Sequence, residues 1–204
     1  MGLFHYQKAY QGDQNVKLNI TALADKLTGQ FALESSKEWE WFESYLTYSN
    51  ARLPHSLFLA YKATQENRYL QIASKSMKFL TNVQTINNVF VPIGNRGWYK
   101  KGSERAVYDQ QSIEASCTTE AAIAAYRNTG EKVYLEAAYQ AFEWFLGGNL
   151  KGLMLYDPEN GSCCDGITPQ GLNQNKGAES TLAYLQARLN LEEVKQQGIL
   201  LKAI

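Results

Sequence analysis

The sequence has little of several residue types that mark particular classes of protein. Its 3 cysteines, two of them adjacent (Cys163 and Cys164), do not form a disulfide framework. With 2 histidines and no paired C-x2-C spacing, we predict no metal site and no cofactor. No stretch approaches the roughly 18 apolar residues of a membrane span. The first residues also lack the basic and apolar regions of a signal peptide, so we expect a cytoplasmic protein with no membrane partner.

An excess of charge of one sign is also missing. The 20 Lys and Arg residues balance the 20 Asp and Glu residues, which gives no field that would attract nucleic acid. The 204 residues, 45% of them apolar, suffice for one core, and no linker rich in Pro, Gly or Ser interrupts them. We therefore expect one domain over residues 1–204, with about the first 10 residues as candidates for disorder. The 13 Tyr and 4 Trp residues could pack in the core or, at a rim, bind flat amphipathic ligands such as sugars.

The chain repeats itself at a fixed period. Residues 60–70 match residues 125–135 without gaps, 65 positions later, and the match continues through the following helical residues. The same shift moves Glu114 onto Glu179. A period of this size predicts stacked supersecondary units, each consisting here of two helices and one long loop.

Hydrophobic periodicity places the helices. We expect helices over 15–31, from Asn50 or Ala51 onward, and over 67–81, 113–128, 132–146 and 178–191, followed by a short final helix. The helix over 113–128 is apolar almost all round and is expected to be an inner one, whereas 132–146 is amphipathic. The sequence therefore predicts an all-α, (α/α) toroid of about three to four helical hairpins, a partial ring whose long loops gather at one end.

The starts of the expected inner helices carry polar residues that packing does not require. Inner helices point their N-termini at the same cavity, so these segments should converge. Capping or structural hydrogen bonding is the alternative for Asn50, Asp109 or Asn175 taken singly, but three caps would not need the other polar residues as well. The three segments contribute Tyr48, Asn50 and Arg52; Asp109, Gln110, Gln111 and Glu114; and Asn173, Asn175 and Glu179.

Two loops add to this group. One carries Asn95, Arg96 and Trp98, and the other carries Asp165 beside a turn glycine. Amides, a few acids and an aromatic platform are typical of a carbohydrate subsite. Paired carboxylates cleave glycosides, one protonating the leaving oxygen and the other activating water. The predicted catalytic acids are Asp109, Glu114, Asp165 and Glu179; a further acid, Glu43, is grouped with the substrate-binding residues. The alternative for Glu114 or Glu179 is a buried carboxylate that holds loop backbone through hydrogen bonds.

Four motifs together resemble a known superfamily. They are W-F-E-x-x-L-x-Y-x-N-A-R-L-P (41–54), G-N-R-G-W (94–98), D-Q-Q-x-I-E-A (109–115), and D-G-I through N-x-N-x-G-A-E-S-T (165–181). Over roughly residues 35–190 the chain resembles the six-hairpin (α/α) toroid superfamily, six-hairpin glycosidase-like. More narrowly it resembles uncharacterised toroid domains of bacterial polysaccharide loci, often associated with glycosyltransferases. The resemblance implies a carbohydrate ligand but assigns no residue role.

Three functions remain open. The chain could be a glycoside hydrolase, a non-catalytic glycan-binding module beside a glycosyltransferase with Trp98 as its platform, or a scaffold that forms a homodimer through its open inner face. Epimerisation is disfavoured because the epimerases of this superfamily use a pair of histidines. Only His55 lies in the part of this chain that resembles them.

Overall fold

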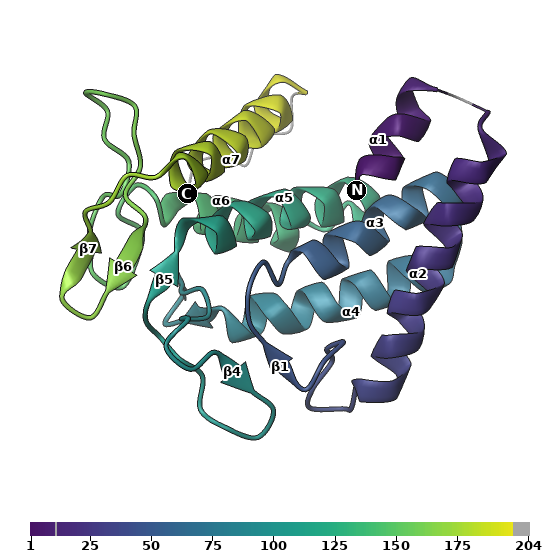
Figure 1. Cartoon of the computed structure of the whole chain (residues 1–204), viewed down its shortest axis with the longest axis horizontal. Coiled ribbons are helices and arrows are strands. Elements are labelled where there is room, and N and C mark those ends of the chain that lie inside the picture. The colour runs from purple at the N-terminus through teal and green to yellow at the C-terminus, as the bar shows by residue number, and fades with distance from the viewer. Residues whose placement is uncertain (11, 198–204) are drawn as a thin grey trace.

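The structure is a computed structural model that describes residues 1–10 and 12–197, and seven α-helices dominate these residues (Figure 1). The predicted helical architecture is therefore confirmed. One α-helix, α7, covers the region where two were expected, and residues 198–204 lie outside the described residues. The helices are α1 (Gly2–Ala9), α2 (Gln14–Glu34), α3 (Arg52–Thr64), α4 (Asn67–Val83), α5 (Ser112–Thr129), α6 (Lys132–Glu143) and α7 (Ala178–Gln196).

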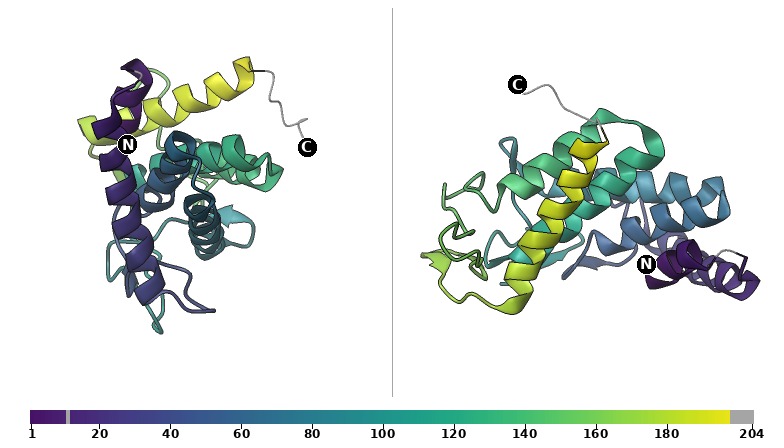
Figure 2. Two further views of the ribbon diagram at one scale, coloured as in Figure 1. Left: turned by 90° about the vertical axis from the view of Figure 1, so that its right-hand side faces the viewer. Right: turned by 90° about the horizontal axis from the view of Figure 1, so that it is seen from above.

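The helices pack in two layers (Figures 1 and 2). In the first layer α3 contacts α5 and α5 contacts α7, while α4 packs on α3 and α6 packs on α5. Helix α2 packs beside α3, and α1 contacts both α2 and α3. The expected pairing of α3 with α4 and of α5 with α6 as hairpins is thus present.

The sequence repeat has a direct counterpart in the two hairpin turns. Gln65 and Gly130 both end a helix in the left-handed conformation, with φ of 65° and 75°. The hydroxyl groups of Thr64 and Thr129 each donate to the carbonyl oxygen four residues earlier, at 2.8 and 2.9 Å. Equivalent residues therefore make equivalent turns, which is what a period of 65 residues predicts.

Helix α5 is buried on nearly all sides because its side chains are small. Its buried residues include Ala115, Ala121, Ala122 and Ala125, which allow α3, α6 and α7 to pack closely around it. Helix α4 instead buries one face, which includes Tyr69, the residue 65 positions before Tyr134 of α6. The prediction that 113–128 forms an inner helix is confirmed.

The first residues of the chain are helical. Residues 2–9 form α1, and Leu3 packs against the main core. Among residues 1–10 and 12–197, no helix combines the length and the apolar character needed to cross a membrane.

Seven short strands lie within the long connections between hairpins. They form two two-stranded sheets and one three-stranded sheet, all antiparallel. These strands fix the long loops on the helical body at the end of the molecule where α5 and α7 begin (Figure 1). The pairs are β1 (Tyr45–Leu46) with β4 (Tyr99–Lys100), β2 (Thr85–Ile86) with β3 (Val89–Phe90), and β6 (Gly166–Thr168) with both β5 (Gln110–Gln111) and β7 (Gly171–Asn173).

Candidate functional site

A polar cavity of about 350 Å³ lies where α5 and α7 begin. Its walls come from the loop around Asn95, from β5, β6 and β7, and from the first turn of α7. Segments far apart in the sequence thus meet here, among them two of the three helix starts that were expected to converge; the start of α3 does not line the cavity. The residues expected at the site that line this cavity are Asn95, Asp109, Gln110, Gln111, Asp165, Asn173 and Glu179.

Close backbone contacts on both sides place Asp109 in the wall. On one side the amide N–H of Asn95 donates to the Asp109 carbonyl oxygen at 2.9 Å, and on the other side β5 pairs with β6. Both contacts require glycine. A Cβ on Gly94 would lie 2.2 Å from the Tyr108 carbonyl oxygen, and a Cβ on Gly166 would lie 1.9 Å from that of Gln110. These two glycines allow the chain to close around residue 109.

The Asp109 carboxylate is only partly paired. Its Oδ2 accepts a hydrogen bond from Arg96 Nε at 3.0 Å, and the Arg96 side chain is 59% exposed. Its Oδ1 is buried and has no hydrogen-bond partner among the described residues. Because Oδ1 is buried, a ligand in the cavity can contact only the remaining, accessible part of the Asp109 side chain, which is 29% exposed as a whole.

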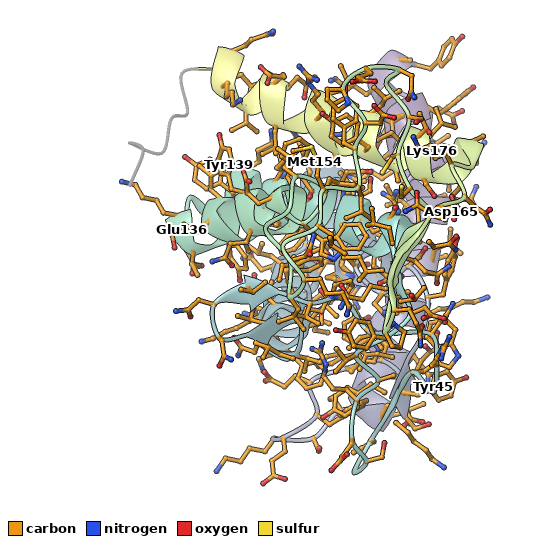
Figure 3. The ribbon with its side chains drawn as sticks, turned by 90° about the vertical axis from the view of Figure 1, so that its left-hand side faces the viewer. Tyr45, Glu136, Tyr139, Met154, Asp165 and Lys176 are labelled. Carbon is orange, nitrogen blue, oxygen red and sulfur yellow. The ribbon has the colours of Figure 1, made fainter. Side chains whose placement is uncertain are left out.

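Asp165 is tied to the start of α7. Its Oδ1 accepts from the Gly177 amide at 2.9 Å and from the Ser180 hydroxyl at 2.6 Å, and its own N–H donates to the Asn175 carbonyl at 2.8 Å. Free N–H groups and the helix dipole both favour a carboxylate at a helix N-terminus. Asp165 therefore joins β6 to α7, and Figure 3 shows it together with Lys176 on this side of the molecule.

Glu179 lies exposed in the first turn of α7. The Tyr48 hydroxyl, from the segment before α3, donates to Glu179 Oε2 at 3.2 Å. Partial burial raises the pKa of Tyr48 first, and the nearby Glu179 carboxylate raises it further. This bond connects the first segment predicted for the site with the last one.

Glu114 is inside the protein and does not line the cavity. Its side chain is 1% exposed, and its carboxylate accepts from the Ser49 amide and from Asn50 Nδ2, the latter at 3.1 Å. Burial raises the pKa of Glu114 to about 7, against the lowering effect of these hydrogen bonds. Glu114 and Asn50 thus fix the turn that precedes α3, where Asn50 also accepts from the Thr47 amide.

Three other predicted residues also make structural contacts. Arg52 forms a two-bond ion pair with Glu120 at 2.6 and 3.2 Å, between α3 and α5. The Gln110 side chain is buried, and its Oε1 accepts from the Trp144 indole at 2.7 Å, so only other parts of Gln110 can face the cavity. Trp98 is half-buried against the main core.

Glu43 and Asn175 are exposed and do not line the cavity. None of Asn50, Asp109 and Asn175 is an N-cap, because the N-cap positions of α3, α5 and α7 are Ala51, Gln111 and Gly177. Asn50 does make the structural hydrogen bonds that were the other part of this alternative.

Sequence reasoning missed two polar side chains of the cavity wall, those of Thr168 and Ser180. Ser180 stands next to Glu179 within a motif already identified, but a serine in a first helical turn usually signals capping. Its bond to Asp165 depends on a contact between residues 15 positions apart, which no local pattern reveals. Within residues 1–10 and 12–197, no group of three His, Cys, Asp or Glu side chains is placed to hold a metal ion.

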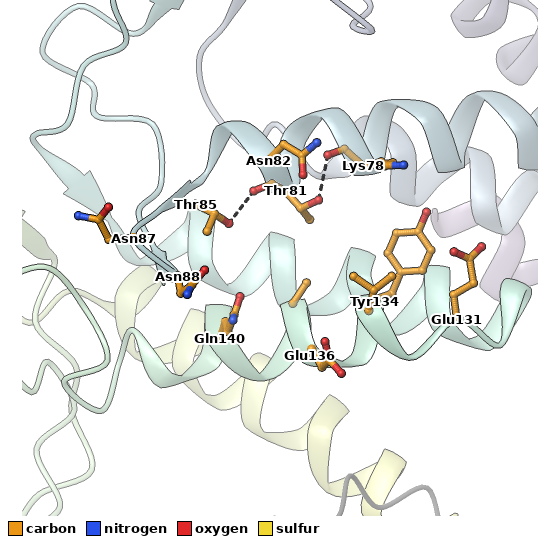
Figure 4. A pocket seen from close by; sticks show the side chains of 12 residues that line it. Lys78, Thr81, Asn82, Thr85, Asn87, Asn88, Glu131, Tyr134, Glu136 and Gln140 are labelled. Carbon is orange, nitrogen blue, oxygen red and sulfur yellow. Dashed lines mark hydrogen bonds between the residues drawn. The ribbon is translucent and has the colours of Figure 1, made fainter. Parts of the chain in front are cut away.

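A larger groove of about 650 Å³ lies on the outer face, between α4 and α6 (Figure 4). None of the predicted site residues lines it. The Thr81 and Thr85 hydroxyls in its wall donate to α4 carbonyls, at 3.0 and 2.8 Å. Both hydroxyl groups therefore already donate within α4.

The sequence matches no known family model and no curated protein. Solved structures do resemble the chain. A glycoside hydrolase of family 76, a mannosidase from Bacteroides thetaiotaomicron VPI-5482, aligns with a TM-score of 0.55 and 20% identity over 72% of this chain and 38% of that one. A D-mannose isomerase aligns with a TM-score of 0.56 and 18% identity over 97% of this chain and 56% of that one.

The chain shares the fold of these two enzymes. The predicted resemblance is therefore confirmed at the level of the fold. The chain spans little more than half the length of the isomerase and less than half that of the mannosidase.

Proposed function

We propose that this chain is a carbohydrate-active protein of the glycoside hydrolase type and that the cavity at the starts of α5 and α7 is its sugar site. One observation carries the proposal: a single cavity collects the carboxylates of Asp109, Asp165 and Glu179 from three separate segments. Amide side chains accompany them, as sugar hydroxyl groups require. The mannosidase and the mannose isomerase that share the fold support a sugar as the ligand.

The contacts of the three acids suggest different roles. Asp165 uses Oδ1 to hold the start of α7, so we assign it to positioning. The Asp109 carboxylate accepts a single hydrogen bond, from Arg96, and Glu179 is exposed and accepts a single hydrogen bond, from Tyr48. We therefore propose Asp109 and Glu179 as the reacting pair, one as general acid to the leaving oxygen and the other as base for water.

The remaining predicted residues divide in the same way. Asn95, Gln111 and Asn173 line the cavity and are proposed to bind sugar hydroxyl groups. Glu114, Asn50 and Arg52 are proposed to maintain the helix packing, because their partners are other protein groups.

A second candidate function is association with another protein chain. Leu182, Leu185 and Leu189 form a stripe on α7 and are 55%, 41% and 66% exposed. Helix α7 would then be an edge of a partial ring, and a second copy or a glycosyltransferase would cover it. A dimer that persists on dilution and dissociates in Leu185→Glu would support this candidate.

The test of the main proposal is product detection after incubation with neutral and acidic oligosaccharides. Asp109→Asn should abolish cleavage while leaving the fold intact, since the Asn side chain keeps the size of Asp. Glu136→Gln, in the outer groove, is the matched control and should cleave normally. Saturable sugar binding without any cleavage would instead favour a glycan-binding module.

A further inference from the structure

The charged side chains that line the cavity are all acidic. Three carboxylates, from Asp109, Asp165 and Glu179, face no Lys, Arg or His side chain among the described residues that line the cavity. The rest of the wall is amide, hydroxyl and backbone, with the two apolar side chains of Ile167 and Ala178. A cavity of this composition offers many hydrogen-bond acceptors and no cation.

The nearby cations are occupied elsewhere. Arg96 Nε binds Asp109 Oδ2, Lys176 Nζ binds Asp157 Oδ2 at 2.7 Å, and Lys151 Nζ donates to the Pro169 carbonyl at 2.8 Å. Arg96 is mostly exposed and offsets part of the charge of one carboxylate. The hydrogen bond with Asp157 raises the pKa of Lys176, and Lys176 would have to break this bond to reach a ligand.

The acceptor groups of the wall show which ligand group fits. The carboxylates of Asp109, Asp165 and Glu179 can only accept hydrogen bonds, and a sugar hydroxyl group supplies a donor. A ligand carboxylate would bring acceptors only, and it would add a negative charge beside the three already present.

We infer that the cavity binds a neutral sugar unit and discriminates against the corresponding uronic acid. This inference rests on the proposed sugar site and adds the substrate class. It concerns one exchange of groups, a primary hydroxyl for a carboxylate, and it can therefore be tested with two ligands of nearly equal size.

The experiment compares binding of methyl mannoside and methyl mannuronoside to the full chain at pH 7 by calorimetry. The mannuronoside should bind weaker by about tenfold or more, because each carboxylate of the wall repels it. Glu179→Gln removes one of these charges and keeps an oxygen that can accept the Tyr48 hydrogen bond, so the ratio of the two dissociation constants should shrink several-fold. Glu136→Gln removes one negative charge from the outer groove and should leave the ratio unchanged.

The outcomes separate the inference from the proposed function. Mannuronoside binding that equals or exceeds mannoside binding would overturn the inference and leave the sugar site standing. A ratio that is equal in wild type and Glu179→Gln would show that the wall carboxylates do not discriminate, which also overturns it. Binding of neither ligand would overturn both.

Discussion

Glu114 and Glu179 occupy the same position of the 65-residue repeat, yet their surroundings are opposite. Glu114 is 1% exposed and binds Ser49 and Asn50 of the preceding unit, whereas Glu179 is exposed and receives one hydrogen bond, from Tyr48. Helix α5 lies between α3 and α7, so its first turn is covered from both sides. Helix α7 packs on α5 and α6, and its first turn borders the cavity.

The difference shows how one repeated carboxylate can take two roles. Where a preceding unit supplies donors on a covering segment, the acid becomes part of the structure. Where the covering segment donates only through the Tyr48 hydroxyl, as at Glu179, the carboxylate stays available to a ligand. The repeat itself therefore does not identify a catalytic residue; the packing around each copy does.

The largest effect is expected from Glu114→Ala. It leaves the buried Ser49 amide and Asn50 side chain without their acceptor and opens a space in the interior, which should cost about 4 kcal/mol of unfolding free energy. Urea unfolding measures this loss of free energy. Glu179→Ala is the matched control and should change stability by less than about 0.5 kcal/mol, since its site is exposed. Equal losses in the two variants would contradict the assigned roles.

The pH dependence of stability should separate Glu114 from His55. The folded pKa of Glu114, about 7, lies above its ordinary 4.5, so its stabilising contribution is complete below pH 4.5 and falls by about 3 kcal/mol as the pH rises to 7. The folded pKa of His55 is lowered by burial to about 3 from 6.5, so its contribution is complete above pH 6.5 and falls toward pH 3. Between pH 4.5 and 6.5 the two slopes oppose each other.

Glu114→Gln should therefore uncover the slope of His55. Unfolding free energies at pH 4.5, 5.5 and 6.5 should rise more steeply with pH in this variant than in wild type. His55→Gln should show the reverse, a fall over the same range. Parallel curves for wild type and both variants would mean that neither group titrates as its burial implies.

Glu179→Gln tests whether the exposed copy of the repeated carboxylate takes part in the reaction. Loss of a general acid or base should lower turnover by about 10²-fold or more, while unfolding free energy stays within about 0.5 kcal/mol of wild type. Glu192→Gln, farther along α7 in a surface pair with Lys195, should retain full turnover. Undiminished turnover in Glu179→Gln would remove Glu179 from the reacting pair.

The smallest effect is expected from Tyr48→Phe. It removes an exposed hydrogen bond of 3.2 Å, so stability should change by less than about 1 kcal/mol. Turnover should drop only a few-fold, because Glu179 loses its orienting donor and keeps its carboxylate. A drop as large as that of Glu179→Gln would instead make Tyr48 a participant in the reaction.

The sequence predicted the helices well because the signals for them are local. The 65-residue period, the helical spacing of apolar residues and the stop at Gly130 are all readable without tertiary contacts, and the alanines of α5 marked it as an inner helix. The meeting of Asp109, Asp165 and Glu179 at one cavity followed from the same architecture.

What the sequence did not predict depends on contacts across the chain. Burial of Glu114 results from the covering turn at Ser49, and the closing of the wall around Asp109 depends on Gly94 and Gly166. Asn175 does not cap α7 because Asp165, twelve residues before Gly177, accepts from the first amide of that helix start in place of a local cap. None of these relations has a signature in neighbouring residues.

The most direct test of the account is a titration of the isotope-labelled chain with methyl mannoside, followed by the chemical shifts of its backbone amides. The amides of Asn95, Asn173 and Ser180 at the cavity should shift in a saturable way, and those of Thr81 and Asn88 in the outer groove should not. Shifts confined to the outer groove, or no saturable shift anywhere, would contradict the claim that the repeat places a sugar site where α5 and α7 begin.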